Sequence, residues 1–343
     1  MKTFVNNQRP SRERAVIITQ TPMRITLAGG GTDVNWYSSL KEGAWISASF
    51  NRYLIVTLTM TEDPNFIGYS YGEEATQGNS YKAIPNPYVM ECLKHSGVTK
   101  GISINISSEV SGRSGLGGSA ALEVGLLYAL NCYKKQPASQ LKLAKDAFHI
   151  ESVKLKRDFI GPQDQYIVAL GGIKYFERDK NGRVDVQNLP LSLHTISELE
   201  SNLLFFRTGI YRDAHVTLVE QKEKATREKI RALDRIKKIG QKAKAYLLKG
   251  DIDSFGETFD EHWQIKKTLS NKVSNKQIDR WYTESKKLGA LGGKIMGAGG
   301  GGWFVFYVNK NKIKFRERMA KLGLEERRVK FDFEGSKVLV DLT

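Results

Sequence analysis

A glycine- and serine-rich stretch runs directly into a helix-forming segment at residues 111–127, which read SGRSGLGGSAALEVGLL. Glycine allows the backbone to approach another molecule closely. The first turn of a helix offers unpaired backbone N–H groups at the positive end of the helix dipole, where anions bind. The stretch therefore predicts either a phosphate-binding loop or an ordinary loop before a helix, and the rest of the chain has to decide between them.

Two further glycine-rich stretches, GGGTD at 29–33 and GAGGGG at 297–302, do not match the common phosphate-loop fingerprints. A Walker A loop is excluded because GGK at 292–294 is followed by isoleucine and lacks the upstream glycine. GAGGGG spells GxGxxG, but it leads into the predicted strand WFVFYV, whereas a dinucleotide fingerprint leads into a helix. Successive glycines beside a buried strand indicate that a ligand or another loop packs closely against Gly299–Gly302.

The remaining pattern predicts an α+β fold, with a strand-rich first half and a helix-rich second half. Strands are predicted at 15–19, 24–28, 53–60, 101–110 and 203–206. Helices are predicted at 86–96, 116–133, 140–156 and 164–170, and a loop-rich region at 62–86. Two or three long charged helices are predicted between about residue 210 and Leu288. We divide the chain into an N-terminal domain, 1–200, and a C-terminal domain, 201–343.

Composition excludes several classes of protein. No stretch approaches the roughly 20 apolar residues that span a bilayer, and the first sixteen residues lack the apolar core of a signal peptide. Cys92 and Cys132 do not make a disulfide framework or a CxxC metal motif. We therefore expect a cytoplasmic protein with no membrane partner, and the oligomeric state stays open, an assembly of identical chains included.

The net charge of +16 comes from 53 Lys and Arg against 37 Asp and Glu. It admits a nucleic-acid partner, and it equally suits an enzyme that acts on phosphates. Much of the excess lies in residues 220–249, where basic, acidic and aliphatic residues alternate as on a solvated helix face. Because aromatic residues do not interleave with these lysines and arginines, we expect no nucleic-acid binding.

The three glycine-rich stretches together resemble the motifs of the GHMP kinases. PMRITLAGGGTD at 22–33 is similar to their first motif, SGRSGLGGSAA at 111–121 to PxxxGLGSSAA, and KIMGAGGGGWF at 294–304 to their third motif. Order and spacing agree over nearly the whole chain. Two departures are Ser111 in place of the usual proline and Gly118 in place of the first serine. The resemblance implies an N-terminal α+β domain like that of a ribosomal protein and a helix-rich, ferredoxin-like C-terminal α+β domain.

One branch of the family is more similar than the others. AGGGTD, IGPQDQYIVALGGI at 160–173, FRTGIYRDA at 206–214 and the pattern Trp263, Lys266, Lys267 resemble the bacterial D-glycero-D-manno-heptose 7-phosphate kinases, and fucokinase-like kinases share parts of this pattern. The resemblance implies phosphorylation of the anomeric hydroxyl of that heptose phosphate by ATP, giving the 1,7-bisphosphate for nucleotide-heptose and polysaccharide synthesis. Two alternatives stay open, a fucose- or galactose-type sugar 1-kinase and, more remotely, a nucleic-acid-binding protein.

The resemblance also implies the residues of a nucleotide and metal site. The residues expected to bind ATP are Gly112, Arg113, Ser114, Gly115, Leu116, Gly117, Gly118, Ser119 and Ala120. Ser119 and Glu151 would bind Mg²⁺, which typically takes one or two carboxylates. Taken locally, Ser119 could instead cap the helix, and Glu151 could be a surface carboxylate beside lysines.

Catalytic roles follow for Asp164, which would accept or orient the proton of the sugar hydroxyl, and for Arg24, which would stabilise the developing negative charge. Locally, Asp164 could be a helix N-cap and Arg24 a surface residue of a strand. The residues expected to contact the sugar are Gly30, Gly31, Thr32, Asp33, Asp164, Gly299 and Gly300, although Asp33 could merely close a turn. Arg212, with Arg113, Lys266 and Lys267 as further candidates, would bind the sugar's own phosphate.

Overall fold

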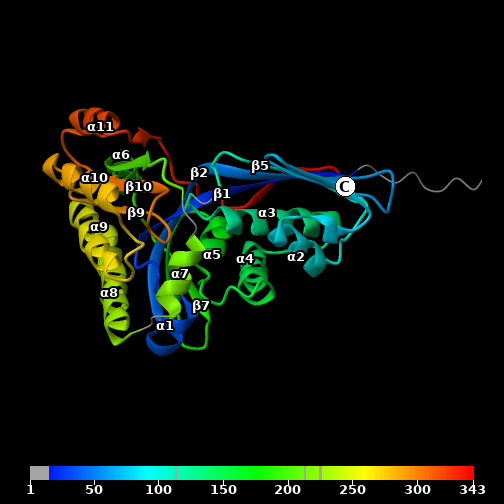
Figure 1. Cartoon of the computed structure of the whole chain (residues 1–343), viewed down its shortest axis with the longest axis horizontal. Coiled ribbons are helices and arrows are strands. Elements are labelled where there is room, and N and C mark those ends of the chain that lie inside the picture. The colour runs from blue at the N-terminus through cyan, green and yellow to red at the C-terminus, as the bar shows by residue number, and fades with distance from the viewer. Residues whose placement is uncertain (1–14, 113, 212–213, 224–225) are drawn as a thin grey trace, which may run out of the picture.

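The structure, a computed structural model, describes residues 15–112, 114–211, 214–223 and 226–343. It is an α+β fold, as predicted, with an eight-stranded and a four-stranded sheet. Figure 1 shows helices α2, α3 and α4 along one face of the long strands β1 and β2, and helices α8 to α11 grouped at the other end of the molecule. No helix among the described residues is long and apolar enough to cross a membrane.

The helices are α1 (Asn35–Lys41), α2 (Pro87–Ser96), α3 (Gly118–Tyr133), α4 (Gln140–His149), α5 (Gln163–Leu170), α6 (Leu193–Asn202), α7 (Ala214–Glu223), α8 (Arg227–Lys249), α9 (Ile252–Lys267), α10 (Lys276–Lys287) and α11 (Lys312–Lys321). A 3₁₀ turn covers Tyr81–Ala83, and a π-helical turn covers Ile150–Lys154. The strands are β1 (Val16–Ala28), β2 (Gly43–Met60), β3 (Ile67–Tyr71), β4 (Glu74–Gly78), β5 (Ile102–Ser108), β6 (Ile173–Arg178), β7 (Val184–Asn188), β8 (Leu203–Arg207), β9 (Gly292–Ile295), β10 (Trp303–Tyr307), β11 (Glu325–Glu326) and β12 (Lys337–Asp341).

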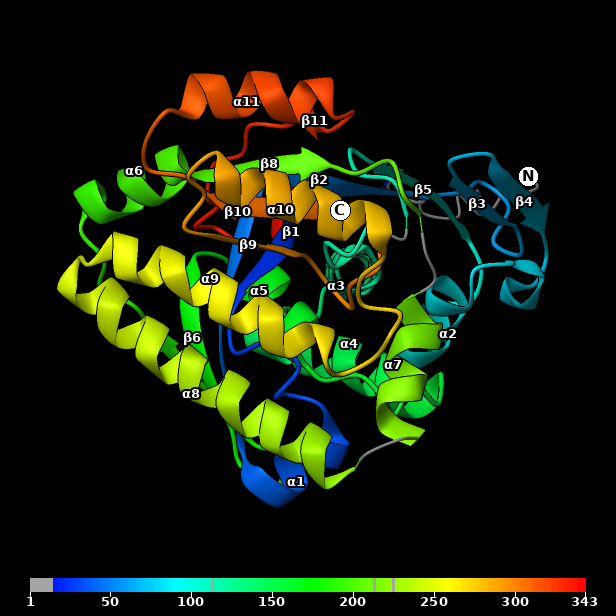
Figure 2. The same ribbon diagram turned by 60° about the vertical axis from the view of Figure 1, so that its left-hand side comes forward.

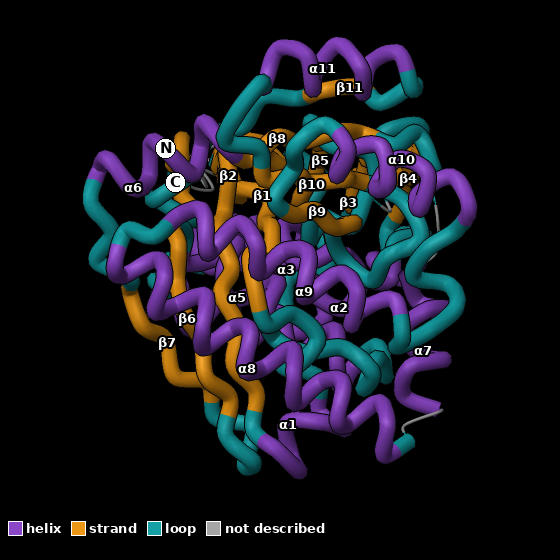
Figure 3. The backbone as a smooth tube through the Cα atoms, turned by 90° about the vertical axis from the view of Figure 1, so that its left-hand side faces the viewer, coloured by secondary structure: helices purple, strands orange, loops and turns teal. Residues whose placement is uncertain are grey.

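Strand β2 organises the larger sheet. It pairs with β1 along most of its length, while its other edge pairs first with β6 and then with β5. Residues 43–50 are all buried, because helices cover both faces of this half. In the second half only Leu54, Val56 and Leu58 are buried, which is the alternation of a sheet with one solvated face. Figure 3 shows α8 crossing this sheet near β2 and β6.

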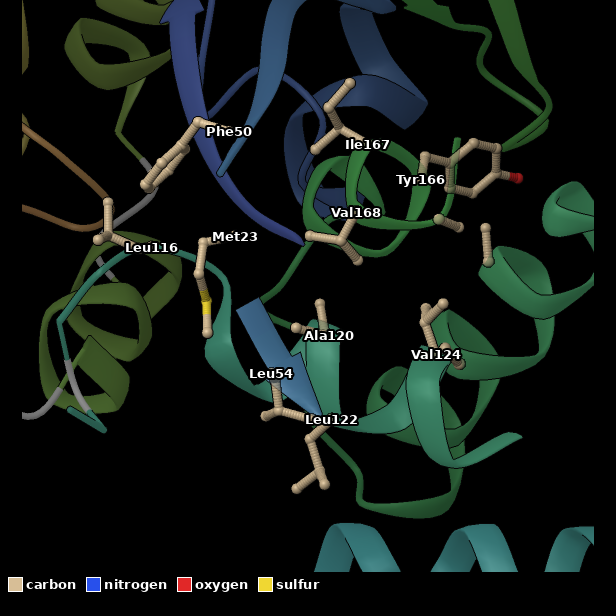
Figure 4. Packing of buried hydrophobic residues seen from close by; sticks show 14 of the residues in the cluster. Met23, Phe50, Leu54, Leu116, Ala120, Leu122, Val124, Tyr166, Ile167 and Val168 are labelled. Atoms are coloured by element: carbon tan, nitrogen blue, oxygen red, sulfur yellow. The ribbon is translucent and has the colours of Figure 1, made fainter. Parts of the chain in front are cut away.

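The core beneath the larger sheet is formed by side chains of β1, β2, α3 and α5. Figure 4 shows Met23 and Leu54 of the strands together with Ala120 and Val124 of α3 and Ile167 of α5. All of these side chains are buried. Residues of the glycine-rich stretch and its helix are therefore anchored in the same core as the strand that carries Arg24.

The smaller sheet has the antiparallel order β11-β8-β10-β9 and packs a second core rich in aromatic side chains. Phe206 of β8 packs against Phe306 of β10, with ring centroids 5.9 Å apart, on one face. Phe205 points the other way and packs against Phe50 of β2, with centroids 6.0 Å apart. The two cores are thus joined through adjacent residues of one strand. Figure 2 shows α10 in front of this sheet, with α9 and α8 side by side below it in the view.

Most predicted elements are confirmed, and four differ. The strand predicted at 53–60 is the second half of β2, which begins at Gly43. The strands predicted at 15–19 and 24–28 are one strand, β1, and the region 62–86 is not loop-rich but contains the β3–β4 hairpin. The helix predicted at 140–156 ends its α-helical part at His149 and continues as the π-helical turn. The residues examined for a signal peptide lie, for the most part, outside the described part of the chain.

The division at residue 200 falls inside α6, and it stays a prediction. One observation bears on it: β12 pairs with β1 in the larger sheet, so residues from the predicted C-terminal domain complete the N-terminal sheet. Thr21 Oγ1 and Ser336 Oγ lie 2.8 Å apart, and a Cβ added to Gly171 would lie 2.3 Å from Gly335 N. The chain therefore crosses back from the second half to the first.

Candidate active site

The glycine-rich stretch before α3 packs directly against Arg24 of β1. Arg24 N donates to Leu116 O at 3.0 Å, and Arg24 Nη1 donates to Gly115 O at 2.6 Å. A Cβ added to Gly117 would lie 2.8 Å from Arg24 Cγ, and Gly117 has φ 80°, a left-handed conformation. Glycine at this position is thus required by both the backbone and its neighbour.

The third glycine stretch packs against other parts of the protein. A Cβ added to Gly299 would lie 2.8 Å from Val273 Cα, and one added to Gly302 would lie 2.2 Å from Ser114 O. Gly300 N donates to Val273 O at 2.6 Å. We expected either a ligand or another loop to pack against Gly299–Gly302. At Gly299, Gly300 and Gly302 other loops of the protein make this close contact. The stretch abuts the glycine-rich loop before α3, and the role of Gly299 and Gly300 toward a sugar stays a prediction.

The first glycine stretch makes the turn between β1 and α1. A Cβ added to Gly29 would lie 2.2 Å from Ala44 O, so the turn closes tightly on β2. The Thr32 hydroxyl donates to Gly29 O and accepts from Ala44 N at 3.0 Å, and Thr32 is fully buried. Gly30 and Gly31 are partly exposed beside this turn. Thr32 therefore stabilises the turn that presents the two glycines.

Arg24 and Asp164 form a paired site between β1 and α5. Arg24 Nε and Nη2 donate to the two carboxylate oxygens of Asp164 at 2.6 and 2.5 Å, a bidentate arrangement. The Arg24 side chain is 6 % exposed and that of Asp164 is 24 % exposed. The N-cap of α5 is Pro162, so Asp164 lies within the first turn and does not cap the helix. The carboxylate is fixed in orientation and still reachable.

Asp33 lies next to this pair and is fully buried. Its Oδ2 accepts from Gln163 N at 3.2 Å, at the start of α5, and among the described residues its Oδ1 has no hydrogen-bond partner. Burial raises the pKa of Asp33 to about 6, with the Asp164 charge adding to the rise. Arg178 Nη1 donates to the Asp33 carbonyl at 2.5 Å. Asp33 thus tethers α5, and its second carboxylate oxygen is buried without a hydrogen-bond partner among the described residues.

The start of α3 leaves its first N–H groups open. The N-cap is Gly117, which has no side chain to accept a hydrogen bond from the first turn. Ser119 therefore lies within the first turn and is not the N-cap. Ala121 N is the first to bond within the helix, to Gly117 O at 2.9 Å. Within the described part of the chain, no side chain makes a hydrogen bond with Ser119 Oγ. Such an end can take an anion and leaves the hydroxyl available to a cation.

Glu151 is held in the π-helical turn and is buried. Gln165 Nε2 donates to Glu151 Oε2 at 2.6 Å, and Tyr88 OH donates to Oε1 at 3.1 Å. Arg157 Nη1 lies 3.5 Å from Oε1 and its guanidinium lies over the Tyr88 ring. Burial is the main cause that raises the pKa of Glu151 to about 7. Glu151 is therefore not a solvated surface carboxylate, and π-turns are frequent at functional sites.

Glu123 is a buried acid that the sequence did not single out. It lies on α3 four residues after Ser119, on the same face of the helix, and it is fully buried. Neither of its carboxylate oxygens has a hydrogen-bond partner among the described residues. Burial and the nearby Glu151 charge raise the pKa of Glu123 well above its usual value. Its sequence signal was a single acid inside the apolar run ALEVGLL.

These residues fit a magnesium ion by donor type. Glu151 supplies a carboxylate, Ser119 a hydroxyl without a partner, and Glu123 places α3 next to Glu151. Mg²⁺ prefers such oxygen donors and keeps several waters and phosphate oxygens. One cation of the chain already lies here, the Arg157 guanidinium 3.5 Å from Glu151 Oε1.

Of the four cations expected to bind the phosphate of the sugar, the structure describes two, and these two have different partners. Lys266 Nζ donates to Ile295 O at 3.0 Å and to Gly297 O at 2.6 Å, so Lys266 supports the third glycine stretch. Lys267 Nζ lies 3.8 Å from Asp279 Oδ1 on α10. Arg113 and Arg212 lie outside the described residues.

Comparison with known proteins gives one consistent result. Residues 86–172 match the family described as GHMP kinases N terminal domain, and residues 243–322 match GHMP kinases C terminal. A D-glycero-alpha-D-manno-heptose 7-phosphate kinase from Campylobacter jejuni is 34 % identical over 310 residues, which cover 86 % of this chain and 90 % of that protein.

Solved structures share the fold. A putative sugar kinase from Campylobacter jejuni has a TM-score of 0.74 and 29 % identity, covering 94 % of this chain and 98 % of that one. A D-glycero-D-manno-heptose 1-phosphate kinase from Bacteroides thetaiotaomicron has a TM-score of 0.78 and 24 % identity, covering 94 % and 99 %.

Proposed function

The chain belongs to the GHMP kinases, and on that premise we propose that it phosphorylates the anomeric (C1) hydroxyl of D-glycero-D-manno-heptose 7-phosphate with ATP, giving the 1,7-bisphosphate. The family consists of ATP-dependent kinases, and the heptose kinase of Campylobacter jejuni supports a sugar kinase. The choice of heptose phosphate as the acceptor rests on the name of that relative.

One observation carries the proposed chemistry: Arg24 joins Asp164 to the loop before α3. Two of its nitrogens hold the carboxylate and the third holds Gly115 O. A phosphoryl group held by that loop would therefore lie near a fixed positive charge and a fixed carboxylate. Phosphoryl transfer depends mainly on such positioning and charge stabilisation. In this proposal Asp164 accepts or orients the proton of the sugar hydroxyl, and Arg24 stabilises the transferred group.

The loop at 112–120 would cradle the nucleotide phosphates. The backbone N–H groups of Gly118, Ser119 and Ala120 precede the first intrahelical bond of α3, and no side chain caps them. Oriented N–H groups at a helix start bind phosphate oxygens without a side-chain charge. α3 is a sixteen-residue helix anchored in the core, so the donors are rigidly held.

Ser119 and Glu151 would hold Mg²⁺, which would neutralise phosphate charge in the transfer. Glu151 is kept in place by Gln165, the residue after Asp164. The same short helix, α5, therefore orients the proposed metal carboxylate and carries the proposed catalytic carboxylate.

Asp33 is assigned to the sugar on the family resemblance alone, since its unpaired Oδ1 is buried. Arg212 is our first choice for the 7-phosphate, with Arg113 and Lys267 as further cations; Lys266 serves the third glycine stretch through Ile295 O and Gly297 O. The planar guanidinium binds a phosphate with two parallel hydrogen bonds. A kinase for a free sugar would need no such site.

A coupled ADP-release assay with ATP and Mg²⁺ tests the proposal. The acceptors are the heptose 7-phosphate, mannose, fucose, galactose, mevalonate and none. Turnover with the heptose phosphate alone is expected. Turnover with a free sugar would replace the proposed acceptor and remove the need for a second anion site. No turnover with any acceptor, together with no ATP binding by calorimetry, would contradict the proposal.

A further inference from the structure

Arg207 ends strand β8 and lies against the beginning of the proposed phosphate loop. Its Nη2 donates to Ser111 Oγ at 3.5 Å and to the Tyr211 hydroxyl. Its guanidinium lies 5.7 Å from the centroid of the Tyr211 ring, which is 56 % exposed. Ser111 is the residue before Gly112, so this guanidinium lies where the chain enters the loop.

The backbone fixes the direction of this side chain. Successive residues of a strand point to opposite faces, so Arg207 shares the face of Phe205, which packs toward β2 and the first core. The next residue, Thr208, donates its N–H and its hydroxyl to Gly302 O at 3.0 and 2.8 Å. Gly302 in turn packs against Ser114 O. Arg207 is therefore held beside the loop by the contact between two glycine stretches.

The charge of Arg207 has no acidic partner in the described part of the chain. Glu325 is opposite Arg207 in the β11–β8 register, but Glu325 pairs with Arg327. By contrast, Arg24 pairs with Asp164 and Arg157 with Glu151. The partners of Arg207 are the neutral hydroxyls of Ser111 and Tyr211. Hydrogen bonding of the Tyr211 phenol to Ser111, and then to Arg207, lowers the pKa of that phenol.

An unneutralised guanidinium at the entrance of a loop favours a phosphate ligand when the far end of that loop leaves backbone N–H groups open. We propose that Arg207 is a nucleotide-binding residue whose guanidinium donates to phosphate oxygens of the bound nucleotide from the side where the chain enters the loop. This inference rests on the proposed function. Both the nucleotide and a sugar phosphate could supply such oxygens, and the nucleotide is favoured because Ser111 is continuous with the loop.

The test compares Arg207→Gln with wild type by calorimetry at low ionic strength without a sugar acceptor. The probes are ADP with Mg²⁺ and adenosine, and Arg207→Lys is the conservative variant. Arg235→Gln is the matched control, since Arg235 is exposed on α8 and has no ion pair among the described residues. We expect the Kd for ADP to rise about five- to tenfold in Arg207→Gln and less in Arg207→Lys, with adenosine binding and the Arg235 variant unchanged.

Equal ADP affinity in Arg207→Gln and wild type would overturn the inference. A parallel loss of adenosine binding, or an equal loss in Arg235→Gln, would also overturn it, because the effect would then be structural or due to net charge. Intact ADP binding with a raised KM for the heptose phosphate would assign the guanidinium to the acceptor. Absence of ADP binding in wild type would contradict the proposed function itself. The other outcomes all require that wild type binds ADP, so the two failures can be told apart.

Discussion

Arg24 and Asp164 lie 140 residues apart in the sequence and meet through two hydrogen bonds of 2.6 and 2.5 Å. A second contact joins the same two elements, because the Thr26 hydroxyl donates to Gln163 Oε1 at 2.9 Å. Arg24 and Thr26 point to the same face of β1, while Gln163 and Asp164 open α5. Two consecutive polar contacts thus fix how α5 approaches the strand, and the orientation of the Asp164 carboxylate depends on both.

Replacing Asp164 with asparagine is expected to reduce kcat about 10²- to 10⁴-fold, because an amide cannot accept the sugar proton. The amide oxygen still accepts one hydrogen bond from Arg24, so the nucleotide loop keeps its support. Calorimetry with ADP and Mg²⁺ should therefore give a nearly unchanged Kd. Near-normal turnover of Asp164→Asn would show that the carboxylate is not catalytic.

Replacing Glu151 with glutamine is expected to raise the Mg²⁺ concentration for half-maximal activity at least tenfold, because a neutral amide is a poor ligand for a hard cation. Mn²⁺ binding to the ADP complex, followed by electron paramagnetic resonance, gives a second readout independent of turnover. Glu198→Gln on α6 is the control, since Glu198 pairs with exposed His194. An unchanged metal requirement in Glu151→Gln would remove Glu151 from the metal site.

Replacing Gly302 with alanine is expected to destabilise the protein by about 3 kcal/mol, from a left-handed backbone and a clash with Ser114 O. Gly209→Ala separates the two causes. Gly209 has φ 69°, and an added Cβ there meets nothing within 4 Å, so its cost should be only about 1 kcal/mol. Urea unfolding measures both, and equal losses would mean that the contact between the loops contributes little.

Replacing Asp33 with asparagine is expected to flatten the dependence of stability on pH. Burial raises the pKa of Asp33 to about 6, so the unfolded chain loses this proton at a lower pH than the folded protein. Wild-type stability should therefore fall as the pH rises from about 4 to 6, with roughly 3 kcal/mol from this group. Above that range the contribution is constant.

Urea unfolding at pH 4.5 and pH 7 checks this. Asp33→Asn should lose less stability between the two values than wild type does. Asp185→Asn on β7 is the control, because Asp185 is exposed. Other buried acids such as Glu123 act in the same direction in every variant, so the difference between variants isolates Asp33. An identical slope in Asp33→Asn and wild type would contradict the expectation.

The loops at the glycine stretches and the α+β fold could be predicted from the sequence, because both depend on local composition. It missed the β3–β4 hairpin because the exposed residues of β4 are polar and carry no apolar alternation. It also left the third glycine stretch open between a ligand and a loop. Whether Val273 or a sugar packs against Gly299 depends on how α9 and α10 are joined, which no local pattern encodes.

The network around Glu151 was less accessible to sequence analysis. Tyr88 lies 63 residues before Glu151, and Gln165 lies 14 residues after it. The three residues lie on different elements, α2, the π-helical turn and α5. No periodicity within one element relates them, so only the folded chain brings them together. Arg207 was missed for a related reason: its relation to Ser111 arises from contacts between two sheets. Residue roles taken from family motifs do not include such neighbours.

The pairing of β12 with β1 has a consequence for biosynthesis. Thr21 and Ser336 are 315 residues apart, yet they meet in the larger sheet. Nearly all of the chain between these two residues must therefore leave the ribosome before this edge of the sheet can pair. Contacts of such long sequence separation form slowly, and until then the edge of β1 stays open to pairing with other chains. Nascent chains interrupted before residue 337 should consequently depend on chaperones, although every proposed catalytic residue has already been synthesised.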